Sequence, residues 1–195
     1  MIIRLAIKND AGCIAEIHQK EIKKGFLSTL NKNFLTKIYS AIIESKDGFC
    51  VVAEESGAII GFAAGATNLN KFYFYFLKKY FFQAVFLLLP QIFNLRKIKK
   101  ILEVLFYSKK ENGLPKAELL TIAVKNQFQG QGIAGQIFER FVFEMKKRGV
   151  DNFKVVVGEK LLPAIKFYEK SGFRFLRNTS IHGKELSRIY IYQIE

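Results

Sequence analysis

Residues 119–134 read LLTIAVKNQFQGQGIA, and they are the most informative part of the chain. Leu119 to Val124 is a continuous apolar run, which predicts a buried strand. A bend rich in glycine and glutamine then leads into an amphipathic helix, expected from about Gly132 to Arg148. Gly130 and Gly132 let the main chain approach a ligand closely, while a helix N-terminus presents unpaired N–H groups and a positive dipole end. The bend therefore predicts a site for a phosphate-bearing ligand.

Two other phosphate-binding motifs have to be weighed against this bend. Gly130, Gly132 and Gly135 also spell GxGxxG, the fingerprint of dinucleotide-binding Rossmann folds. In that fold the glycines follow the strand almost at once, whereas residues 125–129 intervene here. The chain after Gly135 is too short for the other parallel strands, and the next acid, Asp151, falls in a turn where it would not reach a ribose. A Walker P-loop fails too, because no Gly-Lys-Ser/Thr follows.

The chain before this stretch predicts a strand, two helices and a hairpin. Apolar residues alternate at its start, then recur at intervals of three and four, and then form two β-rich runs around a turn. The expected elements are a strand over Ile2 to Ile7, a helix capped by Asp10 with Ile14, Ile17 and His18 at helical spacing, a helix over Leu30 to Ile43, and a hairpin of Phe49 to Glu54 with Ala58 to Thr67 around Ser56 and Gly57.

The chain after the glycine bend predicts one more α/β unit. A strand is expected over Phe153 to Val157, a helix from Pro163 to Lys170 that ends at Gly172, and a last strand over Ile189 to Ile194. With 195 residues, half of them hydrophobic, the chain is long enough to bury a sizeable core. We expect a single domain over residues 1–195.

The segment from about 70 to 116 differs in character and predicts a helical, Phe-rich insertion broken at Pro90, in one or two helices. Its aromatic residues are expected to be core, and the alternatives are a lid over the substrate or a surface that touches a membrane. Aromatic residues crowd into it, and basic residues flank them: Phe72, Tyr73, Phe74, Tyr75, Phe76, Phe81, Phe82, Phe86 and Phe93, with Lys78, Lys79, Arg96, Lys97, Lys99 and Lys100.

Composition narrows the classes of function. The chain has no run of about 18 uncharged apolar residues and no signal-peptide pattern, so we expect a cytoplasmic protein without a transmembrane span. Cys13 and Cys50 lie far apart without metal-ligand spacing, which predicts buried reduced thiols, no disulfide and no metal site. The formal net charge of +14 favours an anionic partner, whether nucleic acid, a membrane surface or a phosphorylated small molecule.

These features together resemble the GNAT superfamily of N-acetyltransferases. Its pyrophosphate motif runs Gln or Arg, two residues, Gly, one residue, Gly or Ala, and Gln127, Gly130 and Gly132 match it. Leu119 to Val124 is similar to the central strand of the family, and residues 164–173, AIKFYEKSGF, are similar to its C-terminal helix and YEKxGF ending. The specific part of the resemblance covers about Ala117 to Phe175.

The resemblance implies an α/β (α+β) GNAT fold, in which a central, mixed and twisted sheet with a splayed strand pair is flanked by helices. It implies an enzyme that binds acetyl-CoA in the gap between the two strands and passes the acetyl group directly to a primary amine. The residues that it assigns to coenzyme A binding are Ile122, Ala123, Val124, Gln127, Gln129, Gly130, Gln131, Gly132, Ile133, Ala134 and Phe167.

For the chemistry, the resemblance makes Tyr168 the general acid that protonates the leaving thiolate. The general base is less defined, because two family positions are replaced: Leu161 stands for an Asn and Val156 for a Glu. Glu118, at the start of the central strand, is the first candidate, although a surface ion pair would explain it equally well. The other candidates are Glu16, Glu159, His18, His182 and a chain of waters, with His18 expected on a helix surface and His182 in a solvated loop.

The acceptor is suggested by a looser similarity to GNAT proteins associated with bacterial surface-polysaccharide synthesis, carried by residues 25–35 and the Phe-rich insertion. It implies an amino sugar, free or nucleotide-linked, contacted by Phe26, Leu27 and Ser28. A protein or peptide amine is the alternative acceptor, and a basic binding protein without catalysis is the alternative from another class. Nucleic acid is not an expected partner, because the aromatics do not alternate with Lys or Arg. Peripheral membrane contact and either a monomer or a homodimer are compatible with the sequence.

Overall fold

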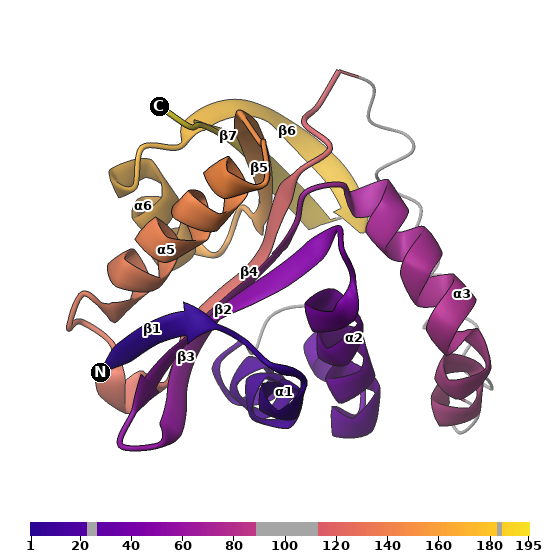
Figure 1. Ribbon diagram of the computed structural model, residues 1–195. Helices are drawn as coiled ribbons and strands as arrows, with labels where there is room; N and C mark the ends of the chain where they lie inside the picture. The colour runs from indigo at the N-terminus through magenta and orange to yellow at the C-terminus, as the bar shows by residue number, and fades with distance from the viewer. Residues whose placement is uncertain (23–26, 89–112, 183–184) are drawn as a thin grey trace.

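The computed structural model describes residues 1–22, 27–88, 113–182 and 185–195. Seven strands in this part of the chain form one sheet in the order β1-β2-β3-β4-β5-β7-β6 (Figure 1), and β4 with β5 is its parallel pair. The strands are β1 (Ile2–Leu5), β2 (Gly48–Glu55), β3 (Ala58–Ala66), β4 (Glu118–Val124), β5 (Asn152–Gly158), β6 (Arg174–His182) and β7 (Glu185–Gln193). The helices are α1 (Ala11–Glu21), α2 (Lys32–Glu44), α3 (Leu69–Leu88), α5 (Ile133–Lys147) and α6 (Leu162–Lys170).

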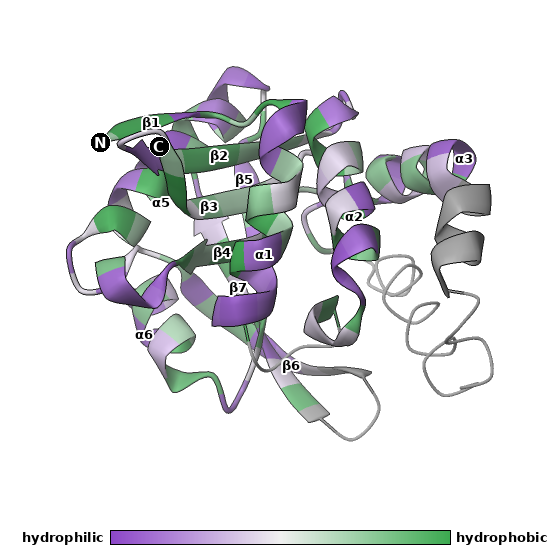
Figure 2. Ribbon diagram, turned by 90° about the horizontal axis from the view of Figure 1, so that it is seen from below, coloured by the Kyte–Doolittle hydropathy of each residue, from purple (hydrophilic) through white to green (hydrophobic). Residues whose placement is uncertain are grey.

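Helices cover both faces of the sheet. In Figure 1, α1 and α2 lie below the sheet while α5 and α6 lie above it, and Figure 2 shows α1 and α2 from their outer side. Each face carries its own hydrophobic cluster. The lower cluster joins α1, α2 and α3 to the sheet, and the upper cluster joins α5 and α6 to it. The fold predicted from the sequence is thereby confirmed as a mixed α/β arrangement.

The predicted hairpin is β2 with β3, paired antiparallel. Its two turn residues, Ser56 and Gly57, have φ of 50° and 78°. Two successive residues at positive φ are what a tight two-residue hairpin turn requires, and this twist matches that of the flanking strands. The turn sets the pairing of Glu54 with Ile59, and a bulge then shifts the register so that Ala53 lies opposite Gly61. Beyond the bulge, the side chains of both strands alternate between the two clusters.

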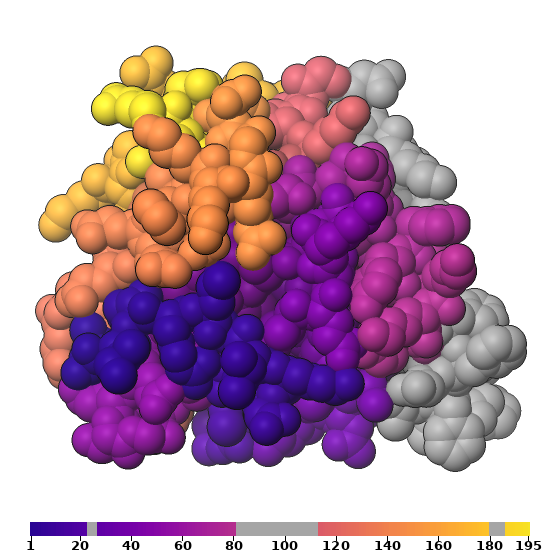
Figure 3. All heavy atoms as spheres, viewed as in Figure 1, coloured from indigo at the N-terminus to yellow at the C-terminus, as the bar shows by residue number. Residues whose placement is uncertain are grey.

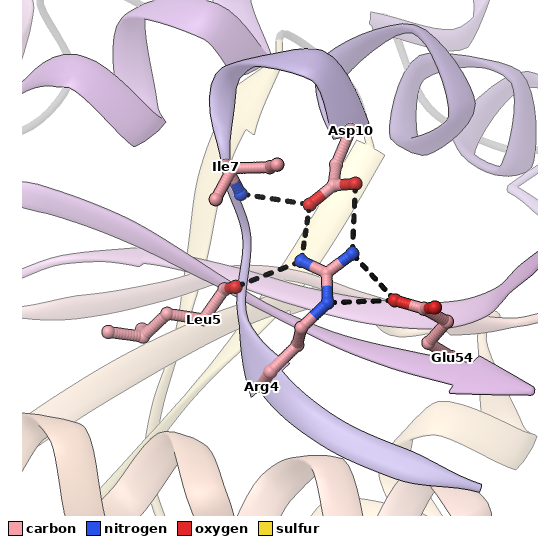
Figure 4. A network of polar contacts seen from close by, with 5 residues as sticks. All are labelled: Arg4, Leu5, Ile7, Asp10 and Glu54. Carbon is pink, nitrogen blue, oxygen red and sulfur yellow. Dashed lines mark hydrogen bonds and ion pairs between the residues drawn. The ribbon is translucent and has the colours of Figure 1, made fainter. Parts of the chain in front are cut away.

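Asp10 was predicted to cap α1, but its carboxylate makes no capping hydrogen bond. It instead accepts from Arg4 Nη1 at 2.7 Å and from the Ile7 main-chain N–H at 2.8 Å (Figure 4). The same guanidinium reaches Glu54 of β2 at 2.8 Å. The carboxylate is thus used by Arg4, a stronger donor than a helix amide. The network fixes β1, the turn after it and β2 together.

Helix α3 confirms part of the predicted insertion. Phe72, Phe76 and Tyr80 recur at helical spacing and are buried, whereas Phe74 is 71% exposed, so the aromatics are core on one face only. The helix is joined to α2 by Glu44, which binds Lys79 at 2.9 Å. Figure 3 shows α3 in magenta at the surface beside α2. Pro90 and the rest of the insertion to residue 112 lie outside the described residues. Among the helices that are described, none has the length and hydropathy of a membrane span.

Three further expectations are corrected. Strand β6 was not predicted, and His182 ends that strand instead of lying in a loop. Cys50 is buried as expected, but Cys13 is exposed. His18 was expected on the helix surface, yet it is 3% exposed. Its spacing from Ile14 and Ile17 places it on the apolar stripe of α1, which faces the sheet.

Candidate active site

The central feature of the site is a pair of strands that separate. Strands β4 and β5 are each seven residues long, but they pair in register through Glu118 and Lys154 alone in the described chain. The Lys154 N–H also donates to the Ala117 carbonyl at 3.0 Å. Beyond this closed end, no strand of the described residues pairs with the edge of β4 that faces β5, so the backbone groups of that edge can bind a ligand or solvent.

The glycine bend lies at the open end of this strand pair. After β4, a short 3-10 turn (Asn126–Phe128) leads to Gly130 and Gly132, with φ of 78° and 77°. At both glycines an added Cβ would meet nothing within 4 Å. The Gln129 side chain ties the bend to the end of β4 by donating to the Val124 carbonyl at 2.8 Å. The bend is therefore braced from within, and its main chain faces open space.

The bend suits the pyrophosphate of coenzyme A. Gly132 occupies the N-cap position of α5 and provides no side-chain cap, so the first N–H groups of this 15-residue helix keep their capacity to donate. Positive helix ends and backbone amides without side chains in front of them are a frequent solution for binding phosphates. The residues that would hold it are those of the bend and the first turn: Gln127, Gln129, Gly130, Gln131, Gly132, Ile133 and Ala134.

Tyr168 of α6 lies on the same face as this helix. It belongs to the cluster that also contains Leu119 and Val124 of β4, and its ring lies 5.3 Å from that of Phe173. The side chain is 6% exposed, and burial raises the pKa of its phenol, which keeps the hydroxyl protonated at neutral pH. Within the described residues the hydroxyl makes no hydrogen bond. Tyr168 is thus a protonated donor whose hydroxyl has no acceptor in the part of the chain that the structure describes.

Phe167 precedes it in α6 and contacts α5. Its ring packs edge-on to Phe138 with centroids 6.1 Å apart, and the side chain is half-buried. Ile122, Ala123 and Val124, the other predicted contacts, form the second half of β4, beyond its single pair with β5. The structure therefore brings the predicted cofactor residues to β4 and to the helices above it.

Glu118 lies at the closed end of the strand pair and not at the open one. Its carboxylate is 3.3 Å from Lys154 Nζ, and both side chains are almost fully buried. Lys154 Nζ also donates to the Pro115 carbonyl at 2.8 Å. The surface ion pair considered from the sequence is therefore an interior one. Two buried opposite charges in contact account for this residue by structure alone, so its role as a base stays a prediction.

The predicted acceptor contacts fall in a turn between α1 and α2. Leu27 and Ser28 belong to a 3-10 turn (Leu27–Thr29), while Phe26 lies outside the described residues. Gln19 of α1 holds the end of this turn by donating to the Leu30 carbonyl at 2.8 Å. The Ser28 Oγ is buried and has no hydrogen-bond partner within the described chain.

Three polar residues that sequence reasoning did not bring together meet below the sheet. His18 Nδ1 of α1 is 2.6 Å from Tyr39 Oη of α2, and the side chain of Thr121 on β4 counteracts the rise in the pKa of that phenol that burial causes. The helical spacing of His18 was a usable signal. Nothing in the apolar run around Thr121 predicts which face of the sheet its side chain occupies.

A β-bulge decides the direction of Thr121. In the β3–β4 pairing, Thr121 is opposite Ala64 but Leu119 is opposite Gly65, so Leu120 is an extra residue. Opposite residues point to the same face, and Ala64 belongs to the lower cluster. The bulge therefore turns Thr121 toward α1 and α2, away from the face that carries Tyr168.

The comparisons with known proteins agree with this geometry. The model of the acetyltransferase (GNAT) family matches residues 16–173. A search of curated proteins found no match.

Solved structures share the fold at low sequence identity. An N-acetyltransferase from Staphylococcus aureus Mu50 is 16% identical with a TM-score of 0.64, and the alignment covers 100% of this chain and 98% of that one. The ribosomal-protein-S18-alanine N-acetyltransferase of Escherichia coli is 16% identical with a TM-score of 0.62 over 100% and 94% of the two chains. A Salmonella typhimurium protein described as an acetyltransferase and solved with its cofactor acetyl-CoA is 14% identical with a TM-score of 0.64, again over 100% and 94%.

The family model covers far more than half of the 195 residues, including β4, the glycine bend, α5 and Tyr168. The chain therefore belongs to the acetyltransferase (GNAT) family, whose enzymes use acetyl-CoA.

Proposed function

We propose that this acetyltransferase transfers the acetyl group to the primary amine of a small molecule, an amino sugar in free or nucleotide-linked form. The main structural support for acetyl transfer from acetyl-CoA is the glycine bend. Two glycines at positive φ with open space in front of them precede an uncapped helix, beside a strand edge that β5 leaves unpaired. This combination offers amides to a pyrophosphate and a strand edge to the arm that follows it.

Tyr168 is proposed as the general acid. In the reaction the amine nitrogen bonds to the thioester carbon, the carbon–sulfur bond breaks, and sulfur receives a proton as the amine loses one. A phenol that burial keeps protonated and that spends its hydrogen on no protein acceptor in the described chain can donate that proton. The base that takes the amine proton is left to water or Glu118, and the Lys154 partner of Glu118 disfavours the latter.

The acceptor is proposed to bind on the lower face, near the turn that contains Leu27 and Ser28. The hydroxyl of Ser28 lies in this turn without a partner among the described residues, and a polar ligand would satisfy it. Helix α3 packs against α2 on the same side of the sheet, and a wall of this kind would favour a short acceptor. The net charge of +14 favours an acceptor that carries phosphate.

A peptide amine is the second candidate. Ribosomal-protein alanine N-acetyltransferases from Escherichia coli and from Brucella melitensis share the fold, with TM-scores of 0.62 and 0.64. At 16% and 12% identity this likeness concerns the fold alone, so it motivates the test without deciding it.

The test is a transfer assay that follows release of the coenzyme A thiol with a panel of amines. The panel contains glucosamine, a nucleotide-linked amino sugar and a peptide with N-terminal alanine. We expect the nucleotide-linked amino sugar to give the highest kcat/KM. A higher kcat/KM for the peptide would replace the proposal by its alternative. Absence of transfer to every amine, with DNA binding that weakens linearly on a log–log salt plot, would indicate a binding protein without catalysis.

A further inference from the structure

Strand β6, at the outer edge of the sheet, carries two exposed arginines, Arg174 and Arg177. Residues three positions apart on a regular strand point to opposite faces of the sheet. Here a β-bulge changes that rule, because Phe175 and Arg177 lie opposite two successive residues of β7 and Leu176 between them is an extra residue. The bulge therefore brings both arginines to one face of the sheet.

The shared face is the lower one. Tyr190 of β7 belongs to the upper cluster, so its neighbours Ile189 and Ile191 point downward. Arg177 lies opposite Ile189 and Arg174 lies opposite Ile191, and opposite residues share a face. Two positions along a strand correspond to about 7 Å, so the side chains of the two arginines start side by side. Bulges that redirect a side chain in this way are frequent next to active sites.

This part of the lower face carries no described helix. The lower cluster joins α1, α2 and α3 to the strands up to β4, and it contains no described residue of β5, β6 or β7. Figure 2 looks onto the lower face and shows β6 without α1, α2 or α3 in front of it. Neither Arg174 nor Arg177 forms an ion pair with another described residue. Two adjacent guanidinium groups of this kind suit a phosphate, which they can bind through paired hydrogen bonds.

The sheet also sets the distance from the arginines to the gap between β4 and β5. Arg177 lies opposite Ile189, and Ile189 lies opposite Val156 of β5, so the three residues form one line across the sheet. Two strand spacings of about 4.8 Å separate the main chains at Arg177 and Val156 by about 10 Å. Val156 lies beyond the single pair of Glu118 with Lys154, where β5 borders the open gap. A ligand held by the arginines can thus extend to that gap.

We propose that Arg174 and Arg177 bind the diphosphate of a nucleotide-linked amino sugar and thereby hold its amine at the gap between β4 and β5. This inference rests on the function proposed above and names the residues that select the nucleotide-linked form of the acceptor. In such a sugar the diphosphate is attached to one ring carbon and the amine to another, so the sugar ring would lie along the line from Arg177 to Val156. The arginines would contribute binding and orientation of the amine, and no proton transfer.

The first test is a binding measurement that requires no acetyl transfer. Uridine diphosphate is titrated calorimetrically into the full chain saturated with coenzyme A, so that the glycine bend is already occupied. We expect Arg177→Gln to raise the Kd for uridine diphosphate about tenfold to a hundredfold, the weight of a hydrogen bond between charged groups. Arg177→Lys keeps the charge but loses the paired hydrogen bonds, so its Kd should lie between those of the wild type and Arg177→Gln.

Arg188→Gln is the matched control, because Arg188 belongs to the same hairpin but to the other face of the sheet. It lies opposite Val157 of β5, a residue of the upper cluster. Loss of a positive charge from the hairpin is the same in both variants, and only the face differs. Arg188→Gln should therefore bind uridine diphosphate as the wild type does. Thermal unfolding of each variant separates a loss of binding from a loss of stability.

The second test compares two amines in the transfer assay. For the nucleotide-linked amino sugar, Arg177→Gln should lower kcat/KM about tenfold to a hundredfold with KM for acetyl-CoA unchanged. For glucosamine, which carries no phosphate, the same variant should keep the kcat/KM of the wild type. This contrast separates binding of the diphosphate from a general disturbance of the active site.

Four results would overturn the inference. They are absence of uridine diphosphate binding by the wild type saturated with coenzyme A, unchanged binding by Arg177→Gln, an equal loss in Arg188→Gln, and an equal loss of kcat/KM for both amines. If no amino sugar is acetylated, the proposed function fails, while the titrations with uridine diphosphate still decide whether Arg174 and Arg177 bind a diphosphate.

Discussion

Two buried tyrosines on opposite faces of β4 differ in what their hydroxyls do. Burial raises the pKa of both Tyr39 and Tyr168. Below the sheet, the hydroxyl of Tyr39 is hydrogen-bonded to His18 with 2.6 Å between the two polar atoms. Above the sheet, Tyr168 lies among Phe167, Phe173 and other rings, and its hydroxyl has no partner in the described chain.

The difference separates structural polar groups from reactive ones. A buried hydroxyl with a protein partner stabilises the fold and holds that partner in place. A hydroxyl without a partner in the described chain keeps its hydrogen available for a ligand. By this criterion Tyr39, below the sheet, holds neighbouring side chains in position, and Tyr168, above the sheet, can donate a proton in the reaction. Four experiments test the roles of these buried and charged groups.

The largest effect is expected from the interior ion pair. Lys154→Met removes the cation beside the buried carboxylate of Glu118, so the free energy of unfolding should fall by about 3–5 kcal/mol. Urea unfolding measures it. The matched double variant Glu118→Gln with Lys154→Met should recover most of the loss. A double variant that is stable but inactive would instead make Glu118 part of the chemistry.

Tyr168→Phe should act on turnover and not on stability. Loss of the proton donor is expected to lower kcat roughly tenfold to a thousandfold, with KM for acetyl-CoA nearly unchanged. Because the hydroxyl has no partner in the described chain, the melting temperature should stay the same or rise slightly. Tyr192→Phe is the control, since this phenol belongs to the same ring cluster, 5.2 Å from Phe173. Equal turnover in both variants would remove Tyr168 from the mechanism.

A smaller, pH-dependent effect is expected where α2 meets α3. Lys8, Tyr80 and Lys79 lower the pKa of Glu44 to about 2, below its ordinary value of 4.5. Because this carboxyl is more acidic in the folded chain than in the unfolded chain, its ionised form stabilises the fold fully above pH 4.5. This stabilisation is lost as the pH falls toward 2. Glu44→Gln should therefore cost about 1–2 kcal/mol at pH 7 and progressively less below pH 4.5. A difference between the two proteins that stays constant from pH 7 to pH 3 would contradict this ion-pair network.

Much of the fold was predictable because local patterns determine it. The apolar run of β4, the glycine bend and α5 were expected within a residue or two, and Ser56 with Gly57 specified the hairpin turn. These features depend on neighbours in sequence. Strand β6 escaped prediction because its residues from Arg174 to Asn178 are all exposed, so no alternation of apolar and polar residues marks it.

The details of the site depended on contacts between distant residues. The burial of Glu118 follows from Lys154, 36 positions away in the sequence, and neither residue alone predicts it. The direction of Thr121 follows from a bulge that only the β3–β4 register reveals. The local sequence predicted Asp10 as a helix cap, but its carboxylate accepts a hydrogen bond from Arg4 instead. In each case a tertiary partner outweighed the local signal.

Calorimetric titration of acetyl-CoA and of S-acetylpantetheine, which lacks the pyrophosphate, tests whether the amides around Gly132 bind that group. The wild type should prefer acetyl-CoA by about a hundredfold, and Gly132→Asp should abolish most of this preference, because it places a carboxylate in the open space before α5. Gly149→Asp is the matched control, at an equally open glycine with φ of 73° after the other end of the same helix, and it should keep the preference. An undiminished preference in Gly132→Asp would contradict the account.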